Sequence, residues 1–325
     1  MINFAVIGTN FITDRFLEAA STVPEFCLKA VYSRTMERAR DYAGRHGAKL
    51  TFDSLDDLAA CPEVDAVYVA SPNCCHAAQS IQMMKAGKHV LVEKPAASNL
   101  REFRRMKETA LENGVILLEA MRSVFSPGFE AVRENLRELG MIRRVSFQFC
   151  QYSSRYDKFK NGIIENAFRP ELSNSALMDI GVYCVHPLVD LFGMPERIQS
   201  SSLKLSNGFE GAGTILVEYD GMQGELIYSK ITDSRVPSQI QGENGVMLID
   251  KIHEPQEVTI FFRDGREKKL DIPKISNNMV YETEEFIRLI HAGKTDRRWI
   301  ENSETEMKIM DEVRGQQGIR FPADN

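Results

Sequence analysis

Short apolar runs alternate with amphipathic stretches along the first 120 residues of the chain. The runs are rich in Val, Ile and Leu without strict alternation, which is typical of parallel strands covered on both faces. Between them, apolar residues recur every three to four positions and indicate helices. Strands that alternate with helices predict a doubly wound parallel sheet with right-handed crossovers. The expected strands are Ile2–Ile7, Leu28–Tyr32, Ala66–Val69, His89–Val92 and Val115–Leu118.

After about residue 140 the pattern changes to period-two alternation, which favours strands with one exposed face. Strands are expected at 143–152, 197–205, 213–219, 223–231, 246–250 and 257–263, and helices near 182–192, 279–292 and 303–314. Asn-Gly and Asp-Gly pairs, which favour tight hairpin turns, lie between them at 207–208, 220–221, 244–245 and 264–265. We therefore expect an α+β domain with a large, mostly antiparallel open sheet. The predicted domains are residues 1–122 and 123–325, with a cleft between them.

Composition narrows the function classes. The 325 residues are 43% hydrophobic and carry a net charge of −6, which argues against a nucleic-acid or anionic-membrane partner. No apolar run approaches the roughly 18 residues of a membrane span, and Met-Ile-Asn-Phe runs directly into a strand with no leader segment. The six cysteines form no C-x-x-C pair and no zinc spacing. We expect reduced thiols, no metal site and a cytoplasmic protein.

The first strand ends at Gly8, where a dinucleotide-binding fold places G-x-G-x-x-G. Asn10 and Thr13 replace the second and third glycines. Asn tolerates left-handed backbone geometry, so the loop could still approach a pyrophosphate, with the next helix donating N–H groups. An ordinary strand–turn–helix would show the same pattern. The residues expected at the cofactor are Gly8, Thr9, Asn10, Phe11 and Ile12.

The second strand indicates which dinucleotide is preferred. It ends in Ser33 and Arg34, where an NAD-specific fold places an acidic residue on the ribose hydroxyls. Ser33 and Arg34 would instead bind a 2′-phosphate. Arg38 follows four residues later, so a helix starting here would put both guanidinium groups on one face. We expect NADP as the preferred cofactor, with NAD as a second; the alternative is two solvated arginines on a surface helix.

Two further strand ends carry polar residues. Ser71, Pro72 and Asn73 follow one strand; Asn73 is a good helix N-cap, and His76 comes one turn later. Glu93 and Lys94 end another strand just before a proline. Ligands bind at this edge of open α/β sheets, so we expect Lys94 at the cleft.

These segments resemble the Gfo/Idh/MocA oxidoreductase family. The resemblance rests on Ile7-Gly8-Thr9, on Ser71-Pro72-Asn73 with His76, and above all on residues 86–95, which end in Glu-Lys-Pro. It implies an N-terminal Rossmann domain that binds NAD(P) and a C-terminal domain whose open sheet forms a homodimer or homotetramer. It also implies that Lys94 reaches the reacting oxygen of a small sugar-like substrate. The implied cofactor contacts are Ser71, Pro72, Asn73, His76, Glu93, Lys94 and Met121, and Arg122 is expected at the substrate.

The second half contributes Asp179, Tyr183 and His186, in a segment that resembles the family's Asp-x-Gly-x-His pattern with Tyr183 at the histidine position. This tyrosine matches the glucose–fructose oxidoreductase and dihydrodiol/D-xylose dehydrogenase branch. The spacing would align the three residues on one helix face, although Pro187 suggests that the helix begins close to His186.

Hydride transfer to or from an alcohol carbon requires a proton carrier and a group that stabilises alkoxide character. We hypothesise that Tyr183 passes the proton, Lys94 polarises the oxygen and favours ionised Tyr183, and Asp179 orients the substrate or Lys94. His186 would bind a substrate hydroxyl or replace Tyr183 as the acid/base. The alternative to these roles is a buried tyrosine and a core histidine that only support the structure. The alternatives to an NADP-dependent oxidoreductase are a dinucleotide-sensing regulator and a redox-assisted glycosidase with tightly held NAD.

Overall fold

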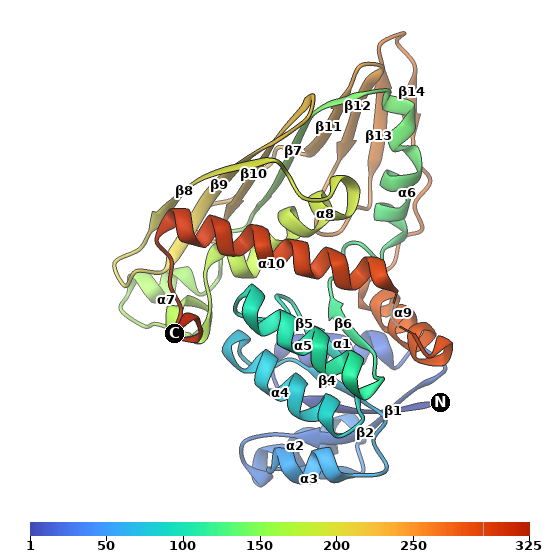
Figure 1. Cartoon of the computed structure of the whole chain (residues 1–325), viewed down its shortest axis with the longest axis vertical. Helices are drawn as coiled ribbons and strands as arrows, with labels where there is room; N and C mark the ends of the chain where they lie inside the picture. Colours follow the sequence, from blue (N-terminus) through green and yellow to red (C-terminus); the bar gives the residue numbers. More distant parts are fainter. Residues whose placement is uncertain (295) are drawn as a thin grey trace. The chain divides into compact units, whose positions relative to one another are not determined.

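The computed structural model describes residues 1–294 and 296–325 (Figure 1). The chain forms two compact units, the first of residues 1–120 and 277–304 and the second of residues 121–276 and 305–325. The sequence assigns 277–304 to the second domain. In the structure this segment includes helix α9 (Met279–Ala292), which packs on α1 (Phe11–Ala20), with the Phe286 ring 5.9 Å from that of Phe4. Periodicity indicates a helix here but not which sheet it covers.

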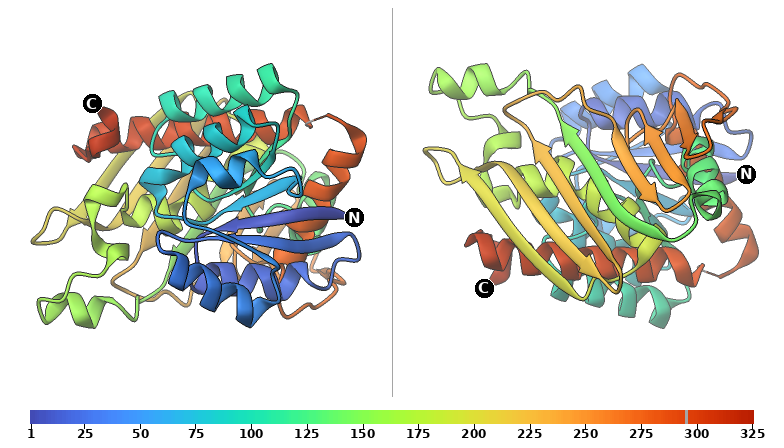
Figure 2. Two further views of the ribbon diagram at one scale, coloured as in Figure 1. Left: turned by 90° about the horizontal axis from the view of Figure 1, so that it is seen from below. Right: turned by 90° about the horizontal axis from the view of Figure 1, so that it is seen from above.

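The first unit contains a six-stranded parallel sheet of order β3-β2-β1-β4-β5-β6, which confirms the doubly wound prediction. Helices cover both of its faces (Figure 2, left). The strands are β1 (Ile2–Ile7), β2 (Phe26–Tyr32), β3 (Leu50–Phe52), β4 (Ala66–Val69), β5 (His89–Glu93) and β6 (Leu117–Ala120). The helices besides α1 and α9 are α2 (Met36–His46), α3 (Leu55–Ala60), α4 (Asn73–Lys85) and α5 (Leu100–Asn113).

Strands β1 and β4 have the predicted bounds, whereas β6 begins two residues later than the expected Val115. Val115 and Ile116 are buried like strand residues, so hydrophobicity alone places the start too early. The three-residue β3 was missed because it is too short to show a period.

The second unit contains an eight-stranded sheet of order β14-β13-β12-β11-β7-β10-β9-β8. Strands β7 and β10 pair parallel and every other neighbouring pair is antiparallel, which confirms a mostly antiparallel sheet. The short β11 and β14 were missed from the sequence. The strands are β7 (Ile142–Cys150), β8 (Arg197–Lys204), β9 (Glu210–Tyr219), β10 (Met222–Ser229), β11 (Ser238–Gly242), β12 (Gly245–Ile249), β13 (Val258–Phe262) and β14 (Glu267–Lys269).

Three of the four Asn-Gly and Asp-Gly pairs have the turn geometry that was expected of them, and the pair at 244–245 does not. Gly208, Gly221 and Gly265 have φ of 81°, 72° and 87°, as such turns require. Gly245 is instead the first residue of β12, and a Cβ there would lie 2.5 Å from the Phe261 oxygen. Close approach of the neighbouring strand, rather than positive φ, therefore explains this glycine.

One face of the eight-stranded sheet packs against α8 (Val182–Phe192) and a π-helical turn at Leu177–Gly181. Among the described residues no helix crosses the other face over β7 to β10 (Figure 2, right). The remaining helices of the unit are α6 (Pro127–Asn135), α7 (Tyr156–Lys160), the 3₁₀ turns Leu136–Leu139, Asn166–Phe168, Pro170–Leu172 and Pro322–Asp324, and the last part of α10 (Arg297–Gln317).

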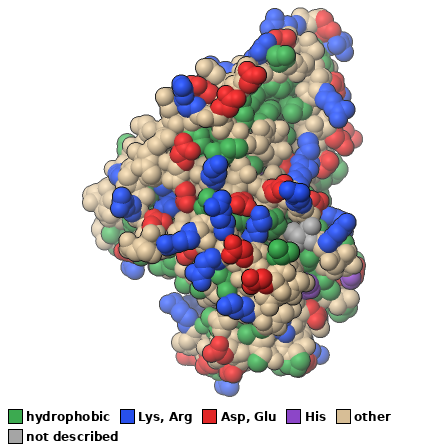
Figure 3. Space-filling model, viewed as in Figure 1, with side chains coloured by type: hydrophobic (Ala, Val, Ile, Leu, Met, Phe, Trp, Pro, Cys, Tyr) green, Lys and Arg blue, Asp and Glu red, His purple; other side chains and the backbone are tan. Residues whose placement is uncertain are grey.

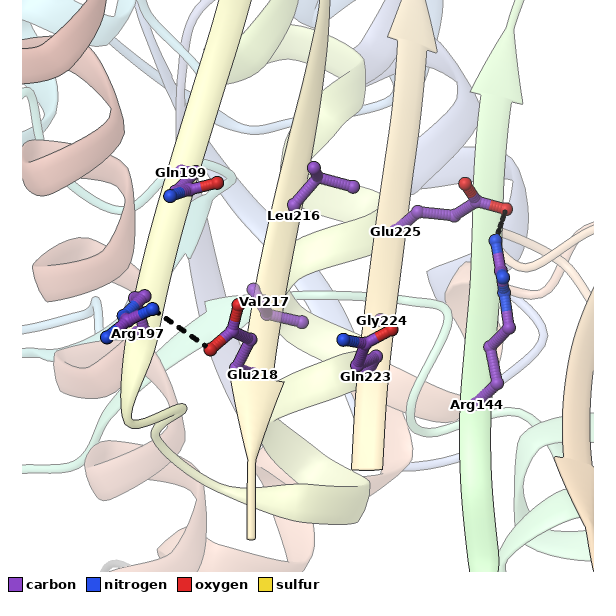
Figure 4. Close-up of a pocket in the computed structure, with 9 residues that line it drawn as sticks. All are labelled: Arg144, Arg197, Gln199, Leu216, Val217, Glu218, Gln223, Gly224 and Glu225. Carbon is purple, nitrogen blue, oxygen red and sulfur yellow. Dashed lines mark ion pairs between the residues drawn. The ribbon is translucent and has the colours of Figure 1, made fainter. Parts of the chain in front are cut away.

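This helix-free face carries both charges and apolar side chains. Arg197 lies 3.5 Å from Glu218, and Arg144 lies 3.2 Å from Glu225, on neighbouring strands (Figure 4). Leu216, 49% exposed, stands between these pairs. Basic and acidic side chains are also interspersed on the molecular surface shown in Figure 3, in keeping with the small net charge.

Candidate functional site

The turn after β1 is built around Gly8. Its φ is +117°, and a Cβ there would lie 2.5 Å from the Ala70 oxygen, so no side chain fits. β1 and β4 are the strands between which the chain order of the sheet reverses, which is the point where α/β sheets bind ligands. Gly8 therefore lets the backbone after β1 pass close to the turn after β4.

Asn10 does not adopt the expected left-handed geometry. Its φ of −108° is extended, and it is the N-cap of α1. Its Oδ1 accepts hydrogen bonds from the backbone N–H groups of Ile12 (3.0 Å) and Thr13 (3.3 Å), while its Nδ2 donates to the Ala70 oxygen (2.8 Å). The side-chain amide thus caps α1 and ties the turn after β1 to Ala70.

The residues expected at a 2′-phosphate follow β2. Ser33 is buried, and Arg34 is exposed just before α2. Arg38 donates from Nε to Thr9 Oγ1 (2.7 Å) and from Nη2 to the Thr9 oxygen (3.1 Å), which joins this segment to the turn after β1. The expectation that Arg34 and Arg38 share a helix face is wrong, because Thr35 is the N-cap and Arg34 precedes the helix.

The turn after β4 is tied to the one after β5 by His76. Its Nδ1 lies 2.9 Å from the Pro95 oxygen and its Nε2 lies 2.8 Å from the Ser71 oxygen. The ring is only 1% exposed, and burial lowers its pKa more than the two carbonyl groups raise it. Asn73 is not the N-cap of α4 but its first residue, because Pro72 takes the cap position.

Two buried glutamates fix the segment that carries Lys94. Glu93 accepts hydrogen bonds from the Tyr68 hydroxyl (2.5 Å) and from the Lys94 backbone N–H (3.1 Å). Glu119 accepts from the Ala96 N–H (2.9 Å) and from the Ser303 hydroxyl (2.6 Å). The Lys94 side chain is half-buried, and the Lys94-Pro95 peptide bond that follows it is cis. Sequence reasoning missed Tyr68 and Ser303, which carry no motif of their own.

The second unit places an aromatic group around Tyr183. The ring of Phe149 lies 5.8 Å from that of Tyr183, and His253 stacks on Phe149 at 3.8 Å. The Arg122 guanidinium lies 5.7 Å from the centre of the Tyr183 ring. Burial, then Arg122 and Lys251, lower the pKa of His253 to about 3. Sequence reasoning missed His253, which follows β12 in a loop without a recognisable motif.

Helix α8 confirms the helix expected near 182–192, and the helical path begins still earlier, so that Asp179 and Tyr183 lie about one turn apart on it. The π turn at Leu177–Gly181 leads directly into α8, and Pro187 lies inside that helix. The expected start near His186 is therefore wrong. Pro187 removes one backbone hydrogen bond, and the helix nevertheless continues through it to Phe192.

Ion pairs engage Asp179 in the π turn and His186 in α8, and only the second pair is buried on both sides. Asp179 Oδ2 lies 2.6 Å from Lys230 Nζ. His186 is 2% exposed, and its Nδ1 lies 2.5 Å from Glu306 Oε2. The sequence predicted neither Lys230 nor Glu306, because each lies in no motif and far along the chain from the residue that it contacts.

The first unit fits a dinucleotide. The carboxyl ends of β2, β1, β4 and β5, which are neighbours in the sheet, carry Ser33, Gly8, Ser71 and Glu93. The N-terminus of α1 begins beside Gly8, where a Cβ would fill the close approach to Ala70. A turn without a side chain beside a helix N-terminus is the geometry that accepts a pyrophosphate.

No helix among the described residues is long and apolar enough to cross a membrane.

The fold and this edge define a dinucleotide-dependent oxidoreductase, and comparison with known families agrees. Residues 2–121 match the family "Oxidoreductase family, NAD-binding Rossmann fold", and residues 129–248 match "GFO/IDH/MocA C-terminal domain". The chain belongs to the GFO/IDH/MocA oxidoreductase family.

Similar proteins span the same length. The chain is 49% identical over 326 residues to scyllo-inositol 2-dehydrogenase (NADP(+)) IolU of Bacillus subtilis, covering 100% of this chain and 99% of that protein. It is 28% identical over 342 residues to human trans-1,2-dihydrobenzene-1,2-diol dehydrogenase, covering 99% of each. Among solved structures, the 3-ketoreductase KijD10 of Actinomadura kijaniata with NADP and TDP-benzene has a TM-score of 0.86 at 23% identity over 98% of both chains and shares the fold.

Proposed function

We propose that this oxidoreductase prefers NADP and transfers hydride between the nicotinamide and an alcohol or carbonyl carbon of a small polyhydroxylated substrate. The observation that carries the proposal is the tie that His76 makes between the turn after β4 and the Lys94 segment, at the edge that fits a dinucleotide. The 49% identity to an NADP-dependent inositol dehydrogenase supports the substrate class.

The preference for NADP rests on the residues after β2. Arg34 is exposed and its guanidinium can meet a ligand, while Arg38 holds the turn after β1 through Thr9. A guanidinium binds a phosphate dianion strongly, whereas the Asp or Glu of NAD-specific proteins would repel it. Ser33 adds a hydroxyl donor beside them.

NADP, when bound, supplies or accepts the hydride at its nicotinamide ring. The chain supplies the remaining chemistry. Lys94 stabilises the alkoxide character of the substrate oxygen through its ammonium, and Tyr183 donates or accepts the proton at that oxygen. Asp179 orients the substrate or Lys94. The Nδ1 of His186 is engaged with buried Glu306, which favours Tyr183 over His186 as the proton carrier.

The surroundings of Tyr183 suit a cyclic polyol. Phe149 and His253 stack on each other at 9° between planes beside the Tyr183 ring, and the outer sides of this stack form an aromatic surface for the C–H face of a ring. His253 stays neutral at neutral pH, because burial and two nearby cations lower its pKa to about 3. A neutral imidazole both donates and accepts hydrogen bonds, which matches a ring hydroxyl.

We further propose that the helix-free face of the eight-stranded sheet forms a homodimer or homotetramer. Its paired charges and exposed Leu216 could meet the same surface of a second copy. Light scattering after gel filtration of the wild type and Leu216→Glu tests this. We expect an oligomer that dissociates in the variant; a monomeric wild type would contradict it.

Initial rates with NADP⁺ and NAD⁺ on inositols, aldoses and dihydrodiols, and with NADPH on the matching ketones, test the function. We expect turnover of at least one cyclic polyol, with NADP⁺ preferred, and a loss of about 100-fold or more in kcat for Tyr183→Phe. Tight cofactor binding without turnover of any substrate would favour a dinucleotide-sensing regulator. Near-normal turnover by Tyr183→Phe would exclude the proton role of Tyr183.

A further inference from the structure

Lys230 is a buried lysine that directly follows β10. Its side chain is 5% exposed, and its Nζ lies 2.6 Å from Asp179 Oδ2 and donates to the Ala167 oxygen at 3.1 Å. The rings of Phe168 and Phe209 lie 5.0 and 5.5 Å from the same nitrogen. Burial of an ammonium is costly unless charge and hydrogen-bond partners compensate, and this site supplies both.

The backbone of Lys230 is held from two sides. Its N–H donates to the Gly211 oxygen at 2.9 Å, and its own oxygen accepts from the Ser153 N–H at 2.9 Å. The side chain therefore extends from a fixed point, between β9 and the segment that follows β7. Since Asp179 lies four residues before Tyr183, the lysine fixes one end of the helical path that carries the proposed proton carrier.

We propose that Lys230 is a positioning residue of the reaction: it holds the Asp179 carboxylate in one orientation and links it to the Asn166–Phe168 turn. This rests on the proposed function, in which Asp179 orients the substrate or Lys94. A carboxylate held in one orientation binds a hydroxyl or an ammonium better than one that rotates freely, so the effect should be largest on the substrate. The cofactor residues after β1 and β2 belong to the other unit and should be affected little.

A purely structural ion pair would behave differently. Removal of a buried lysine takes away its packing as well as its ion pair, and this alone can destabilise a protein. Loss of stability alone is therefore no sign of a role in the reaction. The distinguishing readouts are the split between kcat/KM for the substrate and the Kd for NADPH, and rescue by a residue that keeps the charge.

The experiment compares Lys230→Met, Lys230→Arg and, as a matched control, Lys268→Met, which removes an exposed lysine 2.6 Å from Glu138 in the same unit. We expect Lys230→Met to lower kcat/KM by about 30-fold or more while the Kd for NADPH stays within about threefold, and Lys230→Arg to restore most of the loss. Lys268→Met should match the wild type.

An unchanged kcat/KM in folded Lys230→Met would overturn the proposal, as would equal losses of substrate turnover and cofactor affinity. If Lys230→Met does not fold, Lys230→Gln and Asp179→Asn are combined in a double-mutant cycle. The proposal then requires Lys230→Gln to have little further effect on kcat/KM in the Asp179→Asn background, and additive losses would contradict it. A wild type that binds NADPH but turns over no substrate would instead refute the proposed function.

Discussion

Arg38 donates a hydrogen bond from Nε to the hydroxyl of Thr9 at 2.7 Å, and so joins the helix after β2 to the turn after β1. One side chain thereby connects the position expected for a ribose phosphate with the position expected for the pyrophosphate. Arg34 makes no such contact among the hydrogen bonds described for the chain, and its exposed guanidinium is available to a ligand. The two arginines therefore have separable roles.

Arg34→Asp should weaken NADPH binding far more than NADH binding. The substitution replaces a cation by an anion near the expected 2′-phosphate, which only NADPH carries. We expect a loss of about tenfold or more for NADPH, which is about 1.4 kcal/mol, and little change for NADH. Isothermal titration calorimetry with both cofactors measures this.

Arg40→Asp is the matched control, because Arg40 is also exposed on α2 but two positions from Arg38, on a different side of the helix. It should leave the ratio of the two Kd values unchanged. Equal losses for NADPH and NADH in Arg34→Asp would count against the assignment of NADP.

Gly8→Ala should destabilise the first unit. The added Cβ would lie 2.5 Å from the Ala70 oxygen, at a φ of +117° that L side chains rarely adopt. We expect a loss of about 2 kcal/mol or more in the free energy of unfolding. Gly44→Ala, in the last turn of α2 with open space around the new methyl group, should instead stabilise by roughly 0.5–1 kcal/mol. Urea unfolding of both variants gives the comparison, and equal effects would refute the role assigned to Gly8.

Acidification should destabilise the protein partly through His253. An unfolded histidine takes up a proton near pH 6.5, whereas the pKa of His253 in the folded protein is about 3. Its contribution is therefore nearly complete above pH 6.5 and is lost as the pH falls towards 3, by at most about 1.4 kcal/mol per pH unit. The pKa of buried His76 is lowered in the same direction.

His253→Gln should accordingly show a flatter dependence of the free energy of unfolding on pH between 7 and 5 than the wild type. Urea titrations at a series of pH values measure the slope. Parallel profiles for the two proteins would show that His253 titrates normally in the fold.

The sequence predicts the elements of the first sheet well, because its buried strands and amphipathic helices have clear and different periods. It also predicts which turns face the ligand edge, since carboxyl ends of parallel strands meet there. It misses partners that come from distant segments: Lys230 for Asp179, Glu306 for His186, and His253 beside Tyr183. Local spacing carries no information about such pairs. Asn10 shows the same limit on a smaller scale, because capping and left-handed geometry are both compatible with an asparagine in that turn.

Isotope transfer tests the central claim most directly. NADPH deuterated at C4 of the nicotinamide, in each of its two stereochemical forms, is incubated with the ketone of a cyclic polyol, and the product is analysed by mass spectrometry. Lys94→Ala, purified in parallel, controls for contaminating enzymes. We expect one of the two forms to give an alcohol heavier by one deuterium on carbon with the wild type and almost none with Lys94→Ala. The account would be contradicted if the wild type gave an alcohol without deuterium from both forms of NADPH. It would also be contradicted if Lys94→Ala gave as much labelled alcohol as the wild type.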